Sequence, residues 1–208
     1  MGGPDAGASE QLALRTTPDG ATLPWLQLPG FGARHGFTTR YGGVSRPPFH
    51  ELNLGLSVGD DADAVTENRR RALTSFGADP DRTALLHQEH GTTVHRAEEV
   101  TGFGELRGDA LISKDPAWTL AISAADCVPV LLHDPVRGAA GAAHAGWRGA
   151  AGGVIAAVVR ALREAYGTDP ADLRVAIGPC ISAAAYQVGP EVVRAFRDAG
   201  MPEALATP

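Results

Sequence analysis

The chain has 208 residues, of which 44% are hydrophobic and 20% charged, the composition of an ordinary globular protein with ample material for a core. Its formal net charge of -6 argues against nucleic acid as a general partner, because no basic patch is in surplus. Two cysteines make no disulfide framework, and neither a signal segment nor an apolar run of membrane-spanning length is present. We therefore expect a cytoplasmic protein, with neither a membrane nor a protein partner implied.

Residues 1–22 are rich in Gly, Ala and Asp and are predicted to be a disordered extension before a single domain at residues 23–208. Short apolar runs between turn residues predict strands, and a 3.6-residue apolar period predicts helices. The expected strands lie at residues 23–27, 37–40, 84–87, 118–123, 128–133, 139–144 and 173–177, and the expected helices at 63–76, 150–166 and 190–199. Because these elements interleave without regular alternation, we predict a mixed α/β fold, with a mixed sheet core flanked by helices.

A long loop without any period separates the predicted strand at residues 37–40 from the predicted helix at 63–76. Loops of this length are uncommon in compact domains and are often functional. Its exposed polar candidates are Arg40, Asn53 and Asp60.

Two soft metal ligands fall at predicted strand ends in the middle of the chain. Cys127 follows one apolar run, and His144 ends another. Zinc takes thiolate and imidazole ligands, and His90 is available as a third, although the spacings match no compact zinc signature. Cys127 with His144 as its base would equally suit acyl transfer, with Asp109 or Asp126 orienting the imidazole. Spacing alone does not separate a metal site, a cysteine nucleophile and a packed structural thiol.

A glycine-rich run at residues 146–153 links a predicted strand to a predicted helix. Free N–H groups and the positive helix end would favour an anion there, and Arg148 adds charge. The run is neither a dinucleotide fingerprint nor a P-loop, and glycines needed for close packing explain it equally well. Other residues are interpreted as structural or surface groups: His35, His50, His87, His95, His133 and Cys180.

Several short motifs together resemble the laccase-domain family, in that family's order, from about residue 36 to residue 199. They are GFTTRYGGVS at 36–45, LNLG at 52–55, QEHG at 88–91, GDA at 108–110, ADC at 125–127, HAGWRG at 144–149 and IGPCI at 177–181. The family was long labelled multicopper polyphenol oxidase and is now described as purine nucleoside phosphorylases with adenosine deaminase side activity. Its layered α/β fold is likened to that of toxin domains carrying a Cys–His pair, a Cys–His hydrolase-like architecture.

The resemblance implies a zinc site, with copper as the alternative metal, whose ligands would also be catalytic: His90, Cys127 and His144. On this basis Arg40, Asn53 and Arg148 are candidates for binding phosphate or ribose, since guanidinium groups match oxyanions. Asp109 and Asp126 are candidates for orienting a histidine ligand.

The function expected from the resemblance is phosphorolysis of adenosine, inosine or guanosine to the free base and ribose 1-phosphate. Adenosine deaminase and methylthioadenosine phosphorylase activities are further expectations. The alternatives are a copper-dependent polyphenol oxidase, a metal-free Cys–His hydrolase and an inactive truncated relative. Seven histidines are few for a multicopper oxidase.

Two departures from the family pattern are visible. Glu89 stands where the family commonly has Val or Thr, and the sequence ends at Pro208, where relatives usually continue through a strand–helix–strand segment and an arginine-bearing tail. A short or truncated relative is therefore expected.

Overall fold

The computed structural model of the chain describes residues 11–102 and 104–205. Its contacts divide the chain into two compact units, Met1–Arg82 and Thr83–Pro208. The predicted class, a mixed α/β fold with sheets flanked by helices, is confirmed. Within residues 11–102 and 104–205, no helix is long and apolar enough to cross a bilayer.

The first unit contains a three-stranded antiparallel sheet in the order β1-β2-β3. Its strands are β1 (Gln11–Thr16), β2 (Thr22–Gln27) and β3 (Phe37–Thr38). β1 corrects the predicted disordered extension, because residues 11–16 pair along their whole length with β2. The alternation of Leu12 and Leu14 with other residues is the period of a strand, and the turn that follows closes a hairpin. Residues 1–10 lie outside the described part of the chain.

One α-helix, α1 (Ala62–Phe76), completes the described part of the first unit. Its N-cap is Asp61, two residues before the predicted N-cap Asp63, because the carboxylate of Asp61 accepts the N–H groups of Asp63 and Ala64. It ends as predicted at Gly77, whose left-handed backbone (φ 70) allows it to close the last turn. The core of this unit joins the sheet to the helix through Leu23, Trp25, Leu52 and Ala72.

The second unit is built on a five-stranded mixed sheet in the order β10-β8-β9-β6-β5. Neighbouring strands are antiparallel except β5 and β6, which are parallel. The strands are β5 (Val94–Arg96), β6 (Ala110–Ser113), β8 (Val128–Asp134), β9 (Ala139–Ala145) and β10 (Arg174–Ile177). A separate parallel pair is formed by β4 (Thr83–Ala84) and β7 (Thr119–Leu120), both shorter than predicted.

Three helices follow β9: α2 (Trp147–Gly152), α3 (Val154–Tyr166) and, after β10, α4 (Pro190–Asp198). The single helix predicted from residue 150 is two helices, because Gly153 takes a left-handed conformation (φ 83) between them. Short 3₁₀ turns lie at Pro80–Arg82, Ala97–Glu99, Pro170–Asp172 and Pro202–Leu205.

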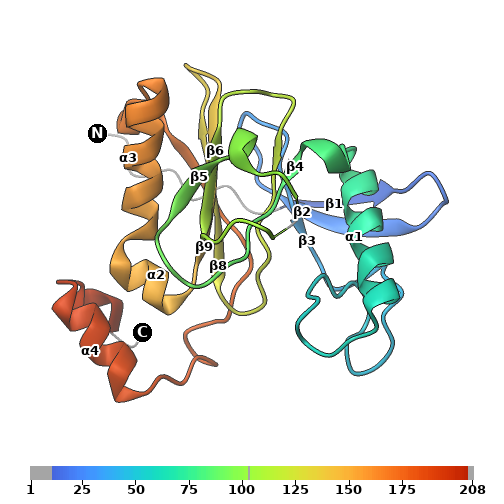
Figure 1. Cartoon of the computed structure of the whole chain (residues 1–208). Helices are drawn as coiled ribbons and strands as arrows, with labels where there is room; N and C mark the ends of the chain where they lie inside the picture. The colour runs from blue at the N-terminus through green and yellow to red at the C-terminus, as the bar shows by residue number, and fades with distance from the viewer. Residues whose placement is uncertain (1–10, 103, 206–208) are drawn as a thin grey trace. The chain divides into compact units, whose positions relative to one another are not determined.

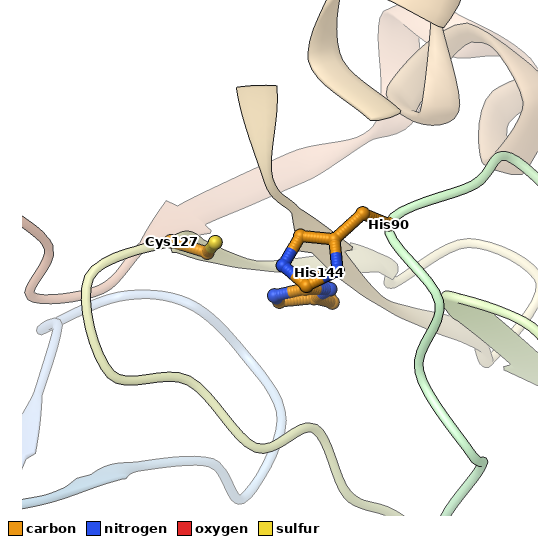
Figure 2. A group of neighbouring side chains, drawn as sticks. All are labelled: His90, Cys127 and His144. Atoms are coloured by element: carbon orange, nitrogen blue, oxygen red, sulfur yellow. The ribbon is translucent and has the colours of Figure 1, made fainter. Parts of the chain in front are cut away.

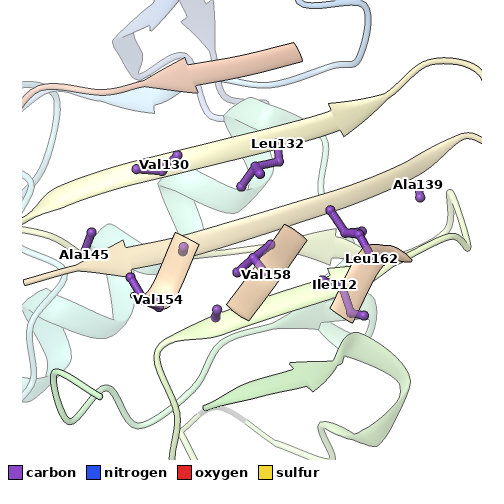
Figure 3. Close-up of a cluster of buried hydrophobic side chains, with 10 residues drawn as sticks. Ile112, Val130, Leu132, Ala139, Ala145, Val154, Val158 and Leu162 are labelled. Atoms are coloured by element: carbon purple, nitrogen blue, oxygen red, sulfur yellow. The ribbon is translucent and has the colours of Figure 1, made fainter. Parts of the chain in front are cut away.

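Helix α3 lies along one face of the five-stranded sheet (Figure 1). Its apolar side chains Val154, Val158 and Leu162 are fully buried against the sheet (Figure 3). Gly141 of β9 permits this close approach, since a Cβ there would lie 2.8 Å from a methyl carbon of Val158. This packing fixes β8 and β9, and therefore the strand ends at which the candidate site lies.

Candidate metal centre

Three side chains from distant parts of the sequence converge at one end of the five-stranded sheet. His90, Cys127 and His144 offer ligand atoms that all lie within 4.8 Å of one another. The Cys127 sulfur points toward the two imidazole rings (Figure 2). The rings meet edge to face, with centroids 4.8 Å apart. One sulfur and two imidazole nitrogens form a donor set that suits zinc or copper, and three protein ligands leave a coordination position for another molecule.

The sheet register explains why Cys127 and His144 meet. Val128, the first residue of β8, is paired with Ala145, the last residue of β9. Because the two strands are antiparallel, Cys127 just before β8 and His144 near the end of β9 lie at the same sheet edge. His144 is buried, Cys127 is half-buried and His90 is exposed, so the group opens to solvent on the His90 side.

Asp109 connects two of the three candidate ligands. Its fully buried carboxylate accepts the backbone N–H groups of Glu89, His90 and Gly91 at 3.2, 2.9 and 2.6 Å. One of its oxygens also lies 2.8 Å from Nδ1 of His144. When Nδ1 donates this hydrogen bond, Nε2 of His144 carries the lone pair that binds a metal. Asp109 thus lies within hydrogen-bond distance of the His144 ring, the contact that the predicted orienting role would use.

The charge on Asp109 is stabilised by these contacts. Burial acts to raise the pKa of its carboxyl group, but the hydrogen bonds from His144 and the three N–H groups outweigh it and lower the pKa. Asp109 is therefore an anion at neutral pH, next to a histidine that can bind a cation.

The backbone of His90 turns sharply at the same point. Its φ of 62 is in the left-handed region, which side-chain-bearing residues seldom adopt. The turn lets three consecutive N–H groups face a single carboxylate, which stabilises the conformation.

The glycine-rich run contributes space. A Cβ at Gly146 would clash with the ring of His90 and lie 3.1 Å from the Cys127 sulfur. A Cβ at Gly149 would lie 2.7 Å from the carbonyl oxygen of Gly91. Of the two interpretations of this run, close packing is therefore the one supported at these glycines.

The pKa of the Cys127 thiol bears on the choice between a metal ligand and a free nucleophile. Burial raises this pKa first, and the negative charges of Asp126 and Asp109 raise it further. The thiolate is the form that attacks carbon or binds metal, so this environment disfavours a metal-free nucleophile. A bound cation would offset all three effects.

Two other predicted site residues of the second unit do not contact the candidate ligands through any observed hydrogen bond. The side chain of Asp126 is exposed, and its carbonyl oxygen accepts the N–H of Ile181 at 3.1 Å. Arg148 is exposed on α2, where its guanidinium lies over the Trp147 ring, 4.2 Å from the centroid.

Arg40 and Asn53 belong to the first unit. The Asn53 amide donates to Asp60 at 2.9 Å and to the Gly55 carbonyl at 3.3 Å, and its oxygen accepts the Gly55 N–H. These contacts hold the loop itself together. Arg40 is exposed, and its Nε donates to the carbonyl of His50 at 3.1 Å.

Arg40 also lines a shallow cleft of about 390 Å³ in the first unit. The other lining residues are Tyr41, Ser45, Pro47, His50 and Glu51. A guanidinium at the edge of a cleft can pair with an oxyanion.

Sequence reasoning misses two residues that the structure places at the site. Gly146 is visible in the sequence only as part of a glycine-rich run. Gln88 is visible only as a motif letter, yet its side chain is bonded to the backbone of Ser123. Its position two residues before a predicted ligand is the available signal.

Fold and site together define a mixed α/β protein in which three residues at one end of the five-stranded sheet could hold a metal ion. A family model described as multi-copper polyphenol oxidoreductase laccase matches residues 34–207, and the chain belongs to that family. This confirms the resemblance found in the motifs.

Relatives in this family carry a further name. A purine nucleoside phosphorylase of Streptomyces coelicolor is 47% identical over 176 residues, which cover 84% of this chain and 72% of that protein. A purine nucleoside phosphorylase of Deinococcus radiodurans is 43% identical over 181 residues, covering 87% of this chain and 70% of that protein. The crystal structure of YlmD from Geobacillus stearothermophilus matches with a TM-score of 0.77 and 37% identity, over 84% of this chain and 68% of that chain.

Proposed function

We propose that this chain is a zinc-dependent purine nucleoside phosphorylase. In this reaction an oxygen of hydrogen phosphate attacks C1′ of the ribose, and the bond from C1′ to the purine nitrogen breaks. Its electron pair leaves with the base, which takes up the proton that the phosphate loses. The products are ribose 1-phosphate and the free purine. The names of the two relatives support the reaction. The observation that carries the proposal is the convergence of His90, Cys127 and His144, with Asp109 hydrogen-bonded to the ring of His144.

His90, Cys127 and His144 would hold the ion. Zinc bound there would supply a Lewis acid that stabilises developing negative charge. Asp109 fixes the ring of His144 and the backbone of His90, so that the His144 imidazole is oriented and the loop that carries His90 is held before the ion arrives. The exposed side of His90 leaves the site open to a substrate.

Arg148 of the second unit is proposed to bind phosphate or ribose, and Arg40 and Asn53 are proposed for the same role, each considered within the first unit alone. Arg148 and Arg40 are exposed cations, which can pair bidentately with an oxyanion. Asp126 is proposed to act only through its charge, because its side chain is exposed. Adenosine deamination and methylthioadenosine phosphorolysis are proposed as further activities of the same site.

The proposal is tested with purified, zinc-loaded protein, given adenosine or inosine with and without phosphate. We expect phosphate-dependent release of adenine or hypoxanthine, together with ribose 1-phosphate, and inosine as the sign of deamination. Cys127→Ser should abolish release. Cys180→Ser is the matched control, because Cys180 is exposed and is not one of the three ligands. Equal turnover by wild type and Cys127→Ser would contradict the proposal.

Copper is the alternative metal, because one soft sulfur and two imidazoles also suit copper and because the family model carries a copper name. Metal analysis of protein purified without added metal distinguishes the two. A stoichiometric copper content, with oxygen consumption in the presence of a phenol, would favour the oxidase over the phosphorylase.

A further inference from the structure

The side chain of Gln88 joins the two chain segments that carry His90 and Cys127. Its Nε2 donates to the carbonyl oxygen of Ser123 at 2.7 Å. Its Oε1 accepts the N–H of the same residue at 2.8 Å. Both partners are main-chain groups of Ser123, so one side-chain amide satisfies the donor and the acceptor of one residue.

These two bonds continue a parallel pairing that the backbone begins. β4 and β7 lie side by side, and the N–H of Ala121 donates to the carbonyl of Ala84 at 2.9 Å just beyond them. At Ser123 the bonding partner is the Gln88 amide, which takes the place of a neighbouring strand. His90 follows Gln88 by two residues, and Cys127 follows Ser123 by four. Gln88 is therefore an anchor point close to both ligands.

The other contacts at the site do not join the His90 loop to the segment before Cys127. Asp109 binds the His90 loop and the ring of His144, and the pairing of β8 with β9 places Cys127 near His144. Neither of these contacts spans from the His90 loop to the segment before Cys127. The Gln88 amide does, and the residue is half-buried, which limits the competition from water for its two hydrogen bonds.

We propose that Gln88 is a positioning residue that sets the separation between His90 and Cys127, so that both reach one ion with His144. The inference rests on the proposed zinc site. Gln88 itself acts through Ser123 and contributes no ligand atom to the group. Loss of such an outer contact typically weakens metal binding by about 10–100-fold.

The test compares Gln88→Met with Ser123→Ala. Methionine has a similar unbranched length but replaces neither hydrogen bond, whereas alanine at Ser123 leaves the bonded main-chain groups in place. Zinc affinity is measured by competition with a chelating dye, and global stability by urea unfolding of the metal-free protein. We expect about 10–100-fold weaker zinc binding for Gln88→Met, wild-type affinity for Ser123→Ala, and metal-free stability close to that of wild type for both.

Hydrogen exchange of the metal-free protein provides a second readout. The Ser123 amide should exchange faster in Gln88→Met, whereas amides within β8 and β9 should keep their protection. Gln88→Asn retains the amide but is one methylene too short, and it replaces the methionine variant should that variant not fold.

The outcomes separate this inference from the proposed function. If wild type binds zinc and Gln88→Met binds it equally tightly, the positioning role is wrong and the metal site stands. If Gln88→Met loses as much free energy of unfolding as it loses free energy of zinc binding, Gln88 is merely structural. This result also overturns the inference. If wild type takes up no zinc, the proposed metal site is wrong. If, in addition, the Ser123 amide exchanges equally fast in wild type and Gln88→Met, the positioning role of Gln88 is rejected as well.

Discussion

Replacing Asp109 with asparagine tests the centre of the site most directly. Each carboxylate oxygen accepts two hydrogen bonds, one from His90 N–H and His144, the other from the N–H groups of Glu89 and Gly91. Asparagine offers one oxygen and one NH₂ group, so the two donors that now bond one carboxylate oxygen would face the NH₂ group, which cannot accept a hydrogen bond. Hydrogen bonds to charged groups contribute about 1.5–3 kcal/mol each, and losing two of them costs about 3–6 kcal/mol. Because the variant no longer buries the charge of Asp109, part of this cost is offset, and we expect about 2–4 kcal/mol of destabilisation.

The same variant should impair the metal site beyond its effect on folding. If the NH₂ group faces Nδ1 of His144, that nitrogen must accept, so Nε2 carries the proton and cannot bind an ion. We expect zinc affinity to fall by at least about 10–100-fold. Urea unfolding measures the first effect and chelator competition the second.

Asp126→Asn is the matched control, because it removes a neighbouring carboxylate whose side chain is exposed. It should leave stability within about 0.5 kcal/mol of wild type. An Asp109→Asn protein with wild-type stability and wild-type zinc affinity would refute the account of Asp109.

Three further variants test separate parts of the structure. Gly146→Ala should weaken zinc binding at least about tenfold and cost about 1–3 kcal/mol of stability, because the added methyl displaces the His90 ring. Unchanged zinc affinity in the chelator assay would contradict this role of Gly146. Leu162→Ala should cost about 2–5 kcal/mol in urea unfolding and leave zinc affinity unchanged, because Leu162 is fully buried in the α3–sheet core. Asp134 is fully buried, and burial acts to raise the pKa of its carboxyl group. The hydrogen bond from the Arg137 N–H, together with other contacts, outweighs burial and lowers this pKa. The stabilising contribution of Asp134 is therefore complete above pH about 4 and is lost as pH falls through the folded-state pKa. Asp134→Asn should accordingly reduce the fall in the free energy of unfolding at acid pH. An unchanged fall would contradict this.

The parts of the fold predicted best are those with strong local signals. β8, β9 and α1 are predicted to within two residues, because each is a continuous apolar or periodic run with a turn or cap beside it. β1 is missed because its two exposed leucines lie in a polar, alanine-containing stretch that resembles a frayed end. The parallel pairing of β5 with β6 depends on contacts between distant residues, which no local pattern encodes.

The candidate site divides in the same way. Residue chemistry suggests Cys127 and His144, while His90 enters as the third ligand through the family resemblance. Their mutual proximity is supported by the geometry of the structure. Gln88 and Gly146 escape sequence reasoning because their roles lie in a bond to a backbone group and in an absent side chain, and both depend on which distant residue is the neighbour.

The three consecutive N–H groups at residues 89–91 form the kind of concavity in which many proteins hold phosphate. Here the chain's own Asp109 occupies it, so an arriving oxyanion meets negative charge at that wall. The charges of Asp109 and Asp126 both act on Cys127, so without a cation an anion close to this thiol is repelled by two carboxylates. Loading should consequently be ordered, with the cation entering first and phosphate gaining affinity only afterwards.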